Sequence, residues 1–338
     1  MGYRIKFKTK NMKKIGINGL GRIGRASLKL ILESENLQLV AVNDLMSIEN
    51  AVYLLKYDSI YGRYEREITH SENTIHIGDK SFHYSSLREI SDLPWGEFQA
   101  EVVIESTGLF TNRADAEKHL ASGAKFVVIS GPTKDTPTIV HGVNTEEGKV
   151  NIFSCASCTT NNISPIIEIL GRRIGIKKAI LNTTHAYTAS QTLMDAPSKK
   201  EPRMGRTAGI NLAPAATGAA LATTKALPQY AGKFDGVAVR VPVSVGSISD
   251  ITFISERPTS AEEINEILIE ESVSQRYKNV VGTTDEPLVS TDIIKSPLAS
   301  IVDLAMTRVV DGDLVKVMSW YDNEWGFTNQ MIRQISAL

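Results

Sequence analysis

The fold of this chain is decided by the stretch KIGINGLGRIGR at residues 14–25. Its first five residues predict a short buried strand, and Gly19, Gly21 and Gly24 follow in the pattern G-x-G-x-x-G. From Ile23 to Leu32, apolar residues recur at helical spacing. A glycine turn between a strand and a helix lets the backbone approach a pyrophosphate, which the amides of the helix N-terminus face. The stretch therefore predicts a dinucleotide-binding turn in a parallel sheet.

Asp44 supports a cofactor at this turn. It follows the second predicted strand, Leu39 to Val42, about 20 residues after the last glycine. A carboxylate there accepts hydrogen bonds from the ribose hydroxyls and repels a 2′-phosphate, and the next residue, Leu45, offers no cation. We therefore expect NAD rather than NADP. Two alternatives stay open: the glycines serve only strand–helix packing, and Asp44 is a turn carboxylate without a ligand.

The rest of the chain indicates two kinds of sheet. Apolar strands at 100–104 and 125–129 alternate with a helix at 114–122, which is typical of parallel pairing with right-handed crossovers. After about residue 158 the strands become longer and alternate in polarity, and Asp311-Gly312-Asp313 predicts a hairpin turn. The alternating strands are Val237–Val241, Ser247–Ile254 and Leu314–Trp320. Between them, Ser260 and Glu263 form a capping box for a helix that buries Ile264, Ile267 and Leu268.

We therefore predict an α/β protein with two domains. The first is a Rossmann-type, doubly wound parallel sheet domain for NAD at residues 1–157, completed by a C-terminal helix at 322–338. The second is an α+β catalytic domain at 158–321 with a mainly antiparallel sheet.

Composition excludes several classes of protein. The 338 residues carry a net charge of -1, so nucleic acid is not expected as the main partner. Hydrophobic residues make up 42%, which argues against a disordered or fibrous chain. No apolar run approaches the ~20 residues of a membrane span, and the basic N-terminus has no apolar segment after it. Since there are only two cysteines, a reducing, cytoplasmic location is expected.

The two cysteines lie together in SCASCTTNN, residues 154–162, between a strand at 150–153 and a helical stretch at 163–170. A thiol at a helix N-terminus has a lowered pKa, which makes Cys158 a candidate nucleophile. The alternative is a small buried core residue, the commonest fate of a free cysteine. Pro165 predicts a kink or a break in the first turns of this helix.

SCASCTTNN and GINGLGRIGR resemble the catalytic and cofactor segments of the phosphorylating glyceraldehyde-3-phosphate dehydrogenase family. Further motifs similar to that family's occur in order along the chain, and only the leader before Lys13 falls outside the resemblance. They are VND at 42–44, ESTG at 105–108, THA at 184–186, ATGAA at 216–220, RVP at 240–242 and SWYDNEWG at 319–326.

The resemblance implies oxidative phosphorylation of D-glyceraldehyde 3-phosphate to 1,3-bisphosphoglycerate, a reaction of glycolysis and gluconeogenesis, with NAD and inorganic phosphate. Cys158 would add to the aldehyde as a thiohemiacetal, and His185 would form an ion pair with it and take the hydroxyl proton as hydride leaves. The resulting thioester is then attacked by phosphate. Without the motif, His185 reads as a core histidine and Arg240 as a surface ion-pair partner.

The resemblance also assigns binding residues. For the substrate phosphate it implies Thr188 and Arg240, and for the attacking phosphate Ser157, Thr159, Thr217 and Gly218, the last two of which are alternatively a mere helix start. For the cofactor it implies Gly19, Gly21, Arg22, Ile23, Gly24, Asp44, Arg88, Thr107, Ser130 and Asn323, with Asn323 on the nicotinamide carboxamide and with Leu45 and Pro197 typical of NAD preference. No metal is expected, because His70, His76 and His83 lack ligand spacing and read as solvated. The segment Thr192–Arg206 resembles a loop that reaches a neighbouring subunit, which implies a homotetramer.

The chain departs from the family at Cys155, where the family usually has Asn, and at Asn162, where it usually has a second Cys. One hypothesis is a peroxide-driven Cys155–Cys158 disulfide; the other is a buried, inert Cys155. Phe327 replaces the usual Tyr near the nicotinamide without removing a catalytic group.

Two other functions stay open from the sequence. A related enzyme that oxidises erythrose 4-phosphate shares the fold and the nucleophile. A non-catalytic NAD-sensing or RNA-binding protein on the same scaffold would need a basic surface groove, and the intact Cys158 and His185 count against it.

Overall fold

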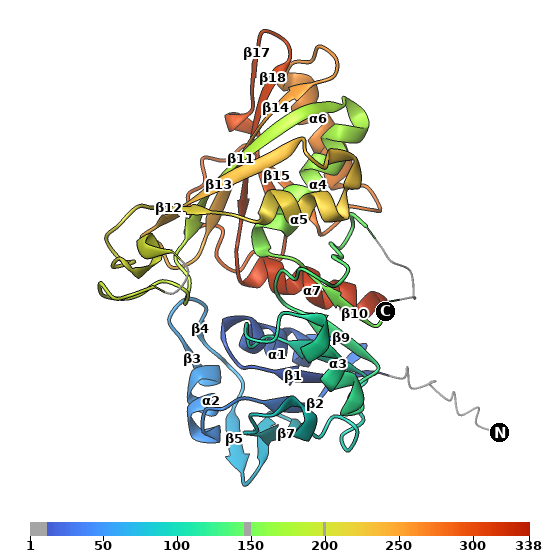
Figure 1. Cartoon of the computed structure of the whole chain (residues 1–338), viewed down its shortest axis with the longest axis vertical. Coiled ribbons are helices and arrows are strands. Elements are labelled where there is room, and N and C mark those ends of the chain that lie inside the picture. Colours follow the sequence, from blue (N-terminus) through green and yellow to red (C-terminus); the bar gives the residue numbers. More distant parts are fainter. Residues whose placement is uncertain (1–11, 145–149, 199–200) are drawn as a thin grey trace, which may run out of the picture.

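The structure is a computed structural model that describes residues 12–144, 150–198 and 201–338. Figure 1 shows two sheets with their helices, one in each half of an elongated molecule, and the C-terminal helix between them. The basic leader up to Asn11 lies outside the described residues.

The first sheet has eight strands in the order β10-β9-β8-β1-β2-β7-β6-β5. The pairs from β10 through β7 are parallel, whereas β7, β6 and β5 form an antiparallel extension that the sequence patterns did not predict. Since β1 is followed by β2 on one side and β8 lies on its other side, the winding reverses at β1. The strands are β1 (Lys13–Asn18), β2 (Leu37–Asn43), β5 (Ile68–Ser71), β6 (Thr74–Ile77), β7 (Lys80–Ser85), β8 (Val102–Glu105), β9 (Phe126–Ile129) and β10 (Ile152–Ser154).

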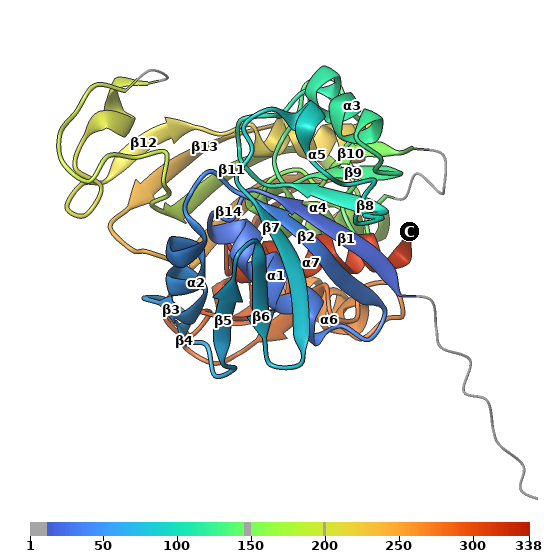
Figure 2. The same cartoon turned by 90° about the horizontal axis from the view of Figure 1, so that it is seen from below.

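The helices of this half cover the apolar strands. The apolar stripe of α1 packs into the first core, and α7 lies beside α1 (Figure 2), contributing Phe327, Met331 and Ile335 to the same core. The last helix therefore belongs to the first core although it is distant in sequence. The elements are α1 (Arg22–Glu33), α2 (Ile48–Lys56), α3 (Arg113–Ala121), α7 (Trp325–Ala337), the short η1 (Ile90–Asp92) and a small hairpin of β3 (Tyr57–Asp58) and β4 (Gly62–Arg63).

The second sheet is mainly antiparallel, with the order β12-β13-β11-β14-β18-β16-β15 and with β17 beside β18. Only the pairs β11–β13 and β15–β16 are parallel. The predicted turn at Asp311-Gly312-Asp313 joins β17 to β18. The strands are β11 (Ile176–Ala186), β12 (Ala213–Ala216), β13 (Phe234–Val241), β14 (Ser247–Ser255), β15 (Val281–Thr284), β16 (Ser300–Asp303), β17 (Arg308–Val310) and β18 (Leu314–Tyr321).

Helix α4 provides the second core with a run of buried isoleucines and leucines from Ile163 to Leu170. The stripe of α6 (Ile264, Ile267 and Leu268) packs into the same core, as the sequence predicts. The helices are α4 (Cys158–Arg173), α5 (Ala219–Ala226), α6 (Ala261–Ser272) and the short η2 (Pro202–Gly205), η3 (Pro228–Tyr230) and η4 (Leu304–Met306). The predicted fold class, a doubly wound α/β sheet with a mainly antiparallel second sheet, is confirmed; the domain bounds 1–157, 158–321 and 322–338 stay a prediction.

Two local predictions need correction. Ser260 caps α6 by accepting a hydrogen bond from the Glu263 amide at 3.2 Å, but the Glu263 carboxylate bonds Arg257 and Thr259, so the reciprocal half of the capping box is missing. A cation within reach is the stronger partner for a carboxylate. Pro165 does not break α4, which is continuous from Cys158 to Arg173. The helix is held there by its buried apolar face, and packing outweighs one lost backbone bond.

Candidate active site

The centre of the candidate site is a thiol facing an imidazole. Cys158 is the first residue of α4 and His185 lies near the end of β11, yet Sγ of Cys158 is 3.3 Å from Nε2 of His185. Nδ1 of His185 lies 2.7 Å from the carbonyl oxygen of Ala186, which can only accept a hydrogen bond. Nη1 of Arg240, which can only donate, lies 2.6 Å from the same Nδ1 and requires a lone pair there, so the two contacts of Nδ1 favour opposite tautomers.

The turn that presents Cys158 is fixed by its own side chains. Ser157 caps α4 by accepting from the Thr160 amide at 3.1 Å. The side-chain amide of Asn161 donates to the carbonyls of Cys155 at 2.8 Å and Ser157 at 2.9 Å. Ala156 has a φ of 60°, which an alanine adopts only where the surroundings hold it. Cys158 is thus held at the helix N-terminus, where the amide dipoles favour a thiolate.

Burial and the Arg240 guanidinium set the charges of this pair. Burial raises the pKa of the Cys158 thiol, while Arg240 pulls that pKa down. Burial, together with the positive charge of Arg240, lowers the pKa of His185 to about 3. Nη1 of Arg240 lies 2.6 Å from Nδ1 of His185 and donates to the Ala186 carbonyl at 3.0 Å. The raised pKa of Cys158 favours a neutral thiol, and the lowered pKa of His185 favours a neutral imidazole. Both pKa values therefore oppose the expected ion pair, which stays a prediction.

A cavity of about 190 Å³ opens beside this pair. Of the residues expected to bind phosphate, five line it: Ser157, Thr159, Thr217, Gly218 and Arg240. Nε of Arg240 is buried and has no hydrogen-bond partner among the described residues. A small cavity with hydroxyls, a helix start and an unsatisfied guanidinium atom suits a phosphate group. Thr188 does not line the cavity, and its hydroxyl pairs with that of Ser190 at 2.9 Å.

The sequence analysis did not single out Tyr321, which supports the cavity from β18. Its hydroxyl lies 2.8 Å from that of Thr159 and 2.9 Å from that of Thr183. The Thr159 hydroxyl is therefore committed to a buried partner. Tyr321 stands inside the motif SWYDNEWG, but only the packing of β18 against α4 and its pairing with β14 give it this position.

The glycine turn has the shape expected of a pyrophosphate site. Gly19 has a φ of +96°, and a Cβ on Gly24 would overlap the carbonyl oxygen of Gly19, so both positions require glycine. A Cβ on Gly21 would meet nothing within 4 Å, and Gly21 starts α1 without any side-chain cap. The N-terminus of α1, with the amides of Arg22 and Ile23, is thus open to an anion.

Asp44 is attached directly to this turn. Its Oδ2 accepts from the Leu20 amide at 2.6 Å and its Oδ1 from the Met46 amide at 3.0 Å. The carboxylate is held at the end of β2 beside the glycine turn and retains lone pairs for ribose hydroxyls. These contacts fit the adenosine ribose of NAD. Exposed Leu45 adds no cation beside it.

A buried polar network supports the same edge of the sheet. Trp95 Nε1, which can only donate, donates a hydrogen bond to Nδ1 of His119 at 2.9 Å. Because Nδ1 accepts, the ring proton of His119 is on Nε2, which donates to Glu105 at 3.0 Å. Asn18 donates to the same Glu105 oxygen at 2.7 Å, and the Thr107 amide donates to the other oxygen at 2.8 Å. The network joins the ends of β1 and β8 to α3. It was not foreseen, because its members are neighbours only after the sheet forms.

Of the other expected cofactor residues, Ser130 and Arg88 follow strands of the first sheet, whereas Asn323 follows β18 of the second. Ser130 follows β9, and its amide bonds the Glu105 carbonyl at 3.0 Å. Exposed Arg88 follows Leu87, whose amide and carbonyl both bond the side chain of Asn43 at the end of β2. Asn323 precedes α7, and its amide oxygen accepts from the Gly246 amide at 3.1 Å and the Ser247 hydroxyl at 3.2 Å. The Arg22 side chain is instead bound by Asp58 and Glu324, so its backbone amide is the group that faces the turn.

The second cysteine has a different environment. Cys155 is buried in the first core, and burial raises its pKa to about 12. Such a thiol is a poor nucleophile, which favours the inert interpretation. Among the histidines that read as solvated, His83 is half-buried and stacks on Phe98 with ring centroids 4.3 Å apart, which corrects that prediction.

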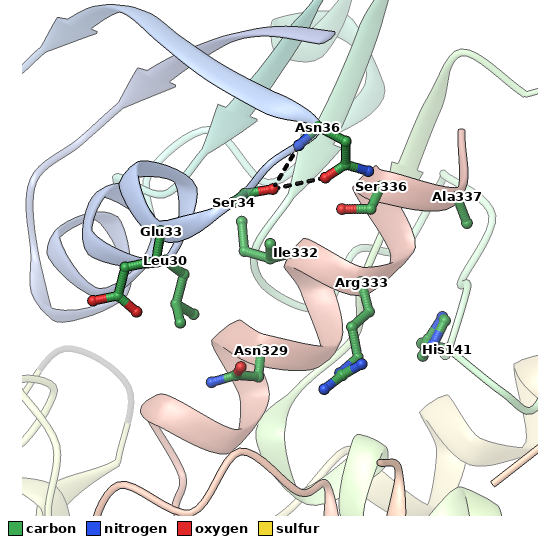
Figure 3. A pocket seen from close by; sticks show the side chains of 10 residues that line it. All are labelled: Leu30, Glu33, Ser34, Asn36, His141, Asn329, Ile332, Arg333, Ser336 and Ala337. Carbon is green, nitrogen blue, oxygen red and sulfur yellow. Dashed lines mark hydrogen bonds between the residues drawn. The ribbon is translucent and has the colours of Figure 1, made fainter. Parts of the chain in front are cut away.

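Other features of the described residues carry none of the expected chemistry. A cavity of about 500 Å³ between α1 and α7 (Figure 3) is lined by residues such as His141, Asn329 and Arg333, and neither cysteine lines it. Within the described ranges, no group of three or more His, Cys, Asp or Glu side chains is arranged to hold a metal ion. No helix in this part of the chain is both long and apolar enough to cross a membrane.

Comparisons with known proteins agree along almost the whole chain. Residues 13–113 match the family described as "Glyceraldehyde 3-phosphate dehydrogenase, NAD binding domain", and residues 157–323 match "Glyceraldehyde 3-phosphate dehydrogenase, C-terminal domain". Glyceraldehyde-3-phosphate dehydrogenase 2 of Streptomyces avermitilis is 44% identical over 94% of this chain and 96% of its own. The protein named glyceraldehyde-3-phosphate dehydrogenase, cytosolic, of Sinapis alba is 42% identical over the same shares. Glyceraldehyde-3-phosphate dehydrogenase of Mycobacterium avium is 42% identical over 96% of this chain and 98% of its own.

Proposed function

The chain belongs to the glyceraldehyde 3-phosphate dehydrogenase family, and we propose that Cys158 and His185 perform the chemistry of that family here. The chain is an NAD-dependent oxidoreductase that oxidises D-glyceraldehyde 3-phosphate with inorganic phosphate to 1,3-bisphosphoglycerate. The comparisons do not favour erythrose 4-phosphate oxidation or a non-catalytic role. The observation that carries the site assignment is the 3.3 Å contact between Sγ and Nε2 beside the Arg240 cavity.

In the first step Sγ of Cys158 attacks the aldehyde carbon and its proton passes to Nε2 of His185. The carbonyl π bond opens, and the same proton passes from Nε2 to the oxygen, which becomes the hydroxyl of a thiohemiacetal. This transfer requires the tautomer with its proton on Nδ1, which the 2.7 Å contact with the Ala186 carbonyl favours and the 2.6 Å contact with Nη1 of Arg240 opposes. The N-terminus of α4 stabilises the thiolate as it forms.

In the oxidation step His185 removes the hydroxyl proton while the C–H electron pair leaves as hydride, giving the thioester. Bound NAD supplies the hydride acceptor. The residues fit NAD: the open N-terminus of α1 suits its pyrophosphate, Asp44 suits its ribose, and the amide nitrogen of Asn323 is left to donate to its carboxamide. Thr107, Ser130 and Arg88 line the same strand ends.

In the last step an oxygen of hydrogen phosphate attacks the thioester carbon and its proton is released to solvent. The C–S bond breaks, Cys158 leaves as thiolate, and the proton that His185 took from the hydroxyl returns to Sγ. Arg240 and the hydroxyls of Ser157 and Thr217 line the cavity that would hold a phosphate. Thr159 and Gly218 contribute at its walls, and Thr188 stays a proposed ligand of the substrate phosphate although its hydroxyl bonds Ser190.

The test is NADH formation from glyceraldehyde 3-phosphate, with and without inorganic phosphate, for wild type and Cys158→Ser. Phosphate-dependent turnover that disappears in the variant is the expected result. Turnover with erythrose 4-phosphate alone, or phosphate-independent turnover, would contradict the proposed substrate or the acyl-enzyme step. Cys155→Ser is the matched control, since its thiol lies in the core away from His185.

A homotetramer is part of the same proposal. The segment between β11 and β12 projects from the body in both views (Figures 1 and 2). It exposes Leu193, Met194, Ile210 and Leu212, each at least 69% accessible. Such a group of exposed apolar side chains suits a subunit interface. A tetrameric mass in light scattering, reduced by Leu193→Asp, is expected; a monomeric wild type would contradict it.

We also propose a cytoplasmic location, which fractionation of the native cell tests.

A further inference from the structure

Asn323 lies between two carboxylates, and both contact the half of the molecule that carries the glycine turn. Asp322 precedes it and reaches Tyr61, while Glu324 follows it and reaches Arg22. None of these side chains has a role in the proposed chemistry, yet their ion pairs and hydrogen bonds are among the most enclosed in the described structure: Asp322 is fully buried, and the Glu324 side chain is 16% exposed.

Asp322 fixes the backbone on both sides of Asn323. One oxygen accepts from the amides of Glu324 at 2.9 Å and Trp325 at 2.8 Å, at the start of α7. The other accepts from the Lys295 amide at 2.7 Å, and the Tyr61 hydroxyl donates to the carboxylate at 2.9 Å. A buried carboxylate with this many donors is costly to move, because any displacement leaves charge unsatisfied.

Glu324 connects the same backbone to the glycine turn. Its Oε2 accepts a hydrogen bond from Nε of Arg22 at 2.8 Å, and Nη2 lies 2.6 Å from the same oxygen as an ion pair without a hydrogen bond. Nη1 of the same guanidinium bonds Asp58 at 2.7 Å, and the guanidinium carbon stands 5.2 Å from the centre of the Tyr61 ring. Arg22 is the first residue of α1 and follows Gly21 directly.

The side chain of Asn323 is also connected to the catalytic histidine segment. The Ser247 hydroxyl donates to the Asn323 amide oxygen at 3.2 Å and accepts from the Ala186 amide at 3.1 Å, next to His185. Asn323 is therefore anchored toward the reaction centre through Ser247 and toward the glycine turn through Glu324 and Asp322.

We propose that Glu324 and Tyr61 are positioning residues that hold Asn323 in register with the glycine turn, so that the phosphate end and the nicotinamide end of NAD bind as one unit. This inference rests on the proposed function, in which Asn323 donates to the carboxamide. Losing either contact loosens Asn323 relative to α1 without removing any group that touches the cofactor. The loss of binding affinity therefore affects only the nicotinamide end of the cofactor.

The experiment compares NAD with ADP-ribose, which lacks the nicotinamide, by calorimetric titration of the full chain. Glu324→Gln and Tyr61→Phe are each expected to weaken NAD binding about tenfold, the effect of one lost charge-assisted bond, and to leave ADP-ribose within about twofold. Asn323→Ala should show the same pattern, and adding Glu324→Gln to it should weaken NAD no further. Glu263→Gln, which loses an exposed ion pair with Arg257, is the matched control with no effect on either ligand.

The outcomes separate the two proposals. If Asn323→Ala leaves NAD binding unchanged, the assigned carboxamide contact is wrong. The positioning role is wrong if Asn323→Ala weakens NAD binding selectively while Glu324→Gln and Tyr61→Phe do not. These two variants would then weaken the binding of NAD and ADP-ribose equally, or would weaken the binding of neither ligand. Should one of these two variants fail to fold, the other decides, and Glu324→Asp, which keeps the charge, should recover part of the loss in NAD affinity.

Discussion

Nη1 of Arg240 lies 2.6 Å from Nδ1 of His185, on the opposite side of the ring from Cys158, whose Sγ lies 3.3 Å from Nε2. One cation thereby acts on both reacting groups. Its charge opposes the imidazolium and favours the thiolate.

Arg240→Gln should raise the pH at which Cys158 becomes reactive. Arg240 lowers the thiol pKa, so its loss raises that pKa, and at any pH below it the thiolate fraction falls. We expect the inflection of the iodoacetamide alkylation rate to move up by roughly one pH unit. Arg257→Gln, at an exposed ion pair, is the control. An unmoved inflection in Arg240→Gln would contradict the electrostatic role.

The same variant should raise the pKa of His185. Burial and then Arg240 hold it at about 3, so removing the cation lets it rise toward the ordinary value while burial still keeps it below. The expected result is an upward shift of the His185 titration in imidazole NMR spectra. A shift downward, or none, would show that Arg240 does not carry this part of the effect.

Asp44→Asn should relax the preference for NAD over NADP. The amide oxygen still accepts from the Leu20 amide, while the Met46 amide loses its acceptor and the charge that repels a 2′-phosphate is lost. The ratio of kcat/KM for NADP to that for NAD should rise about tenfold, equivalent to ~1.4 kcal/mol. Steady-state kinetics with both cofactors checks this. An unchanged ratio would place cofactor selection elsewhere.

His119→Ala should destabilise the fold. The change leaves Trp95 Nε1 without its acceptor and Glu105 without one donor in a fully buried site. We expect a loss of about 2–4 kcal/mol in the free energy of unfolding, measured in urea by tryptophan fluorescence. His70→Ala, at an exposed position, should change stability by less than about 0.5 kcal/mol. Equal effects of the two changes would argue against the network.

Peroxide should modify Cys158 and leave Cys155 reduced. Burial raises the pKa of Cys155 to about 12, so it holds almost no thiolate near neutral pH. Thiol counting after denaturation should show the same loss in wild type and in Cys155→Ser. Loss of two thiols in the wild type, reversed by dithiothreitol and absent from Cys155→Ser, would instead support the disulfide hypothesis.

Much of this protein follows from local sequence. Gly19 and Gly24 fix the first turn, because the positive φ of Gly19 and the close approach of Gly24 to the Gly19 carbonyl exclude side chains. The alternation of apolar strands and helices determines a doubly wound sheet, since parallel strands need crossovers. The quoted motifs carried the resemblance that pointed to Cys158 and His185.

The tertiary structure decided what depends on residues distant along the chain. Only folding brings His185 to Cys158 across 27 positions, commits the Thr159 hydroxyl to Tyr321, and turns the Arg22 side chain toward Glu324 rather than toward the pyrophosphate turn. It also placed Trp95, His119 and Glu105 in one buried network that no local pattern indicates. The reason is physical: propensity and periodicity act over a few neighbouring residues, whereas burial, hydrogen-bond partners and pKa shifts depend on which strand and helix ends the packed core brings together.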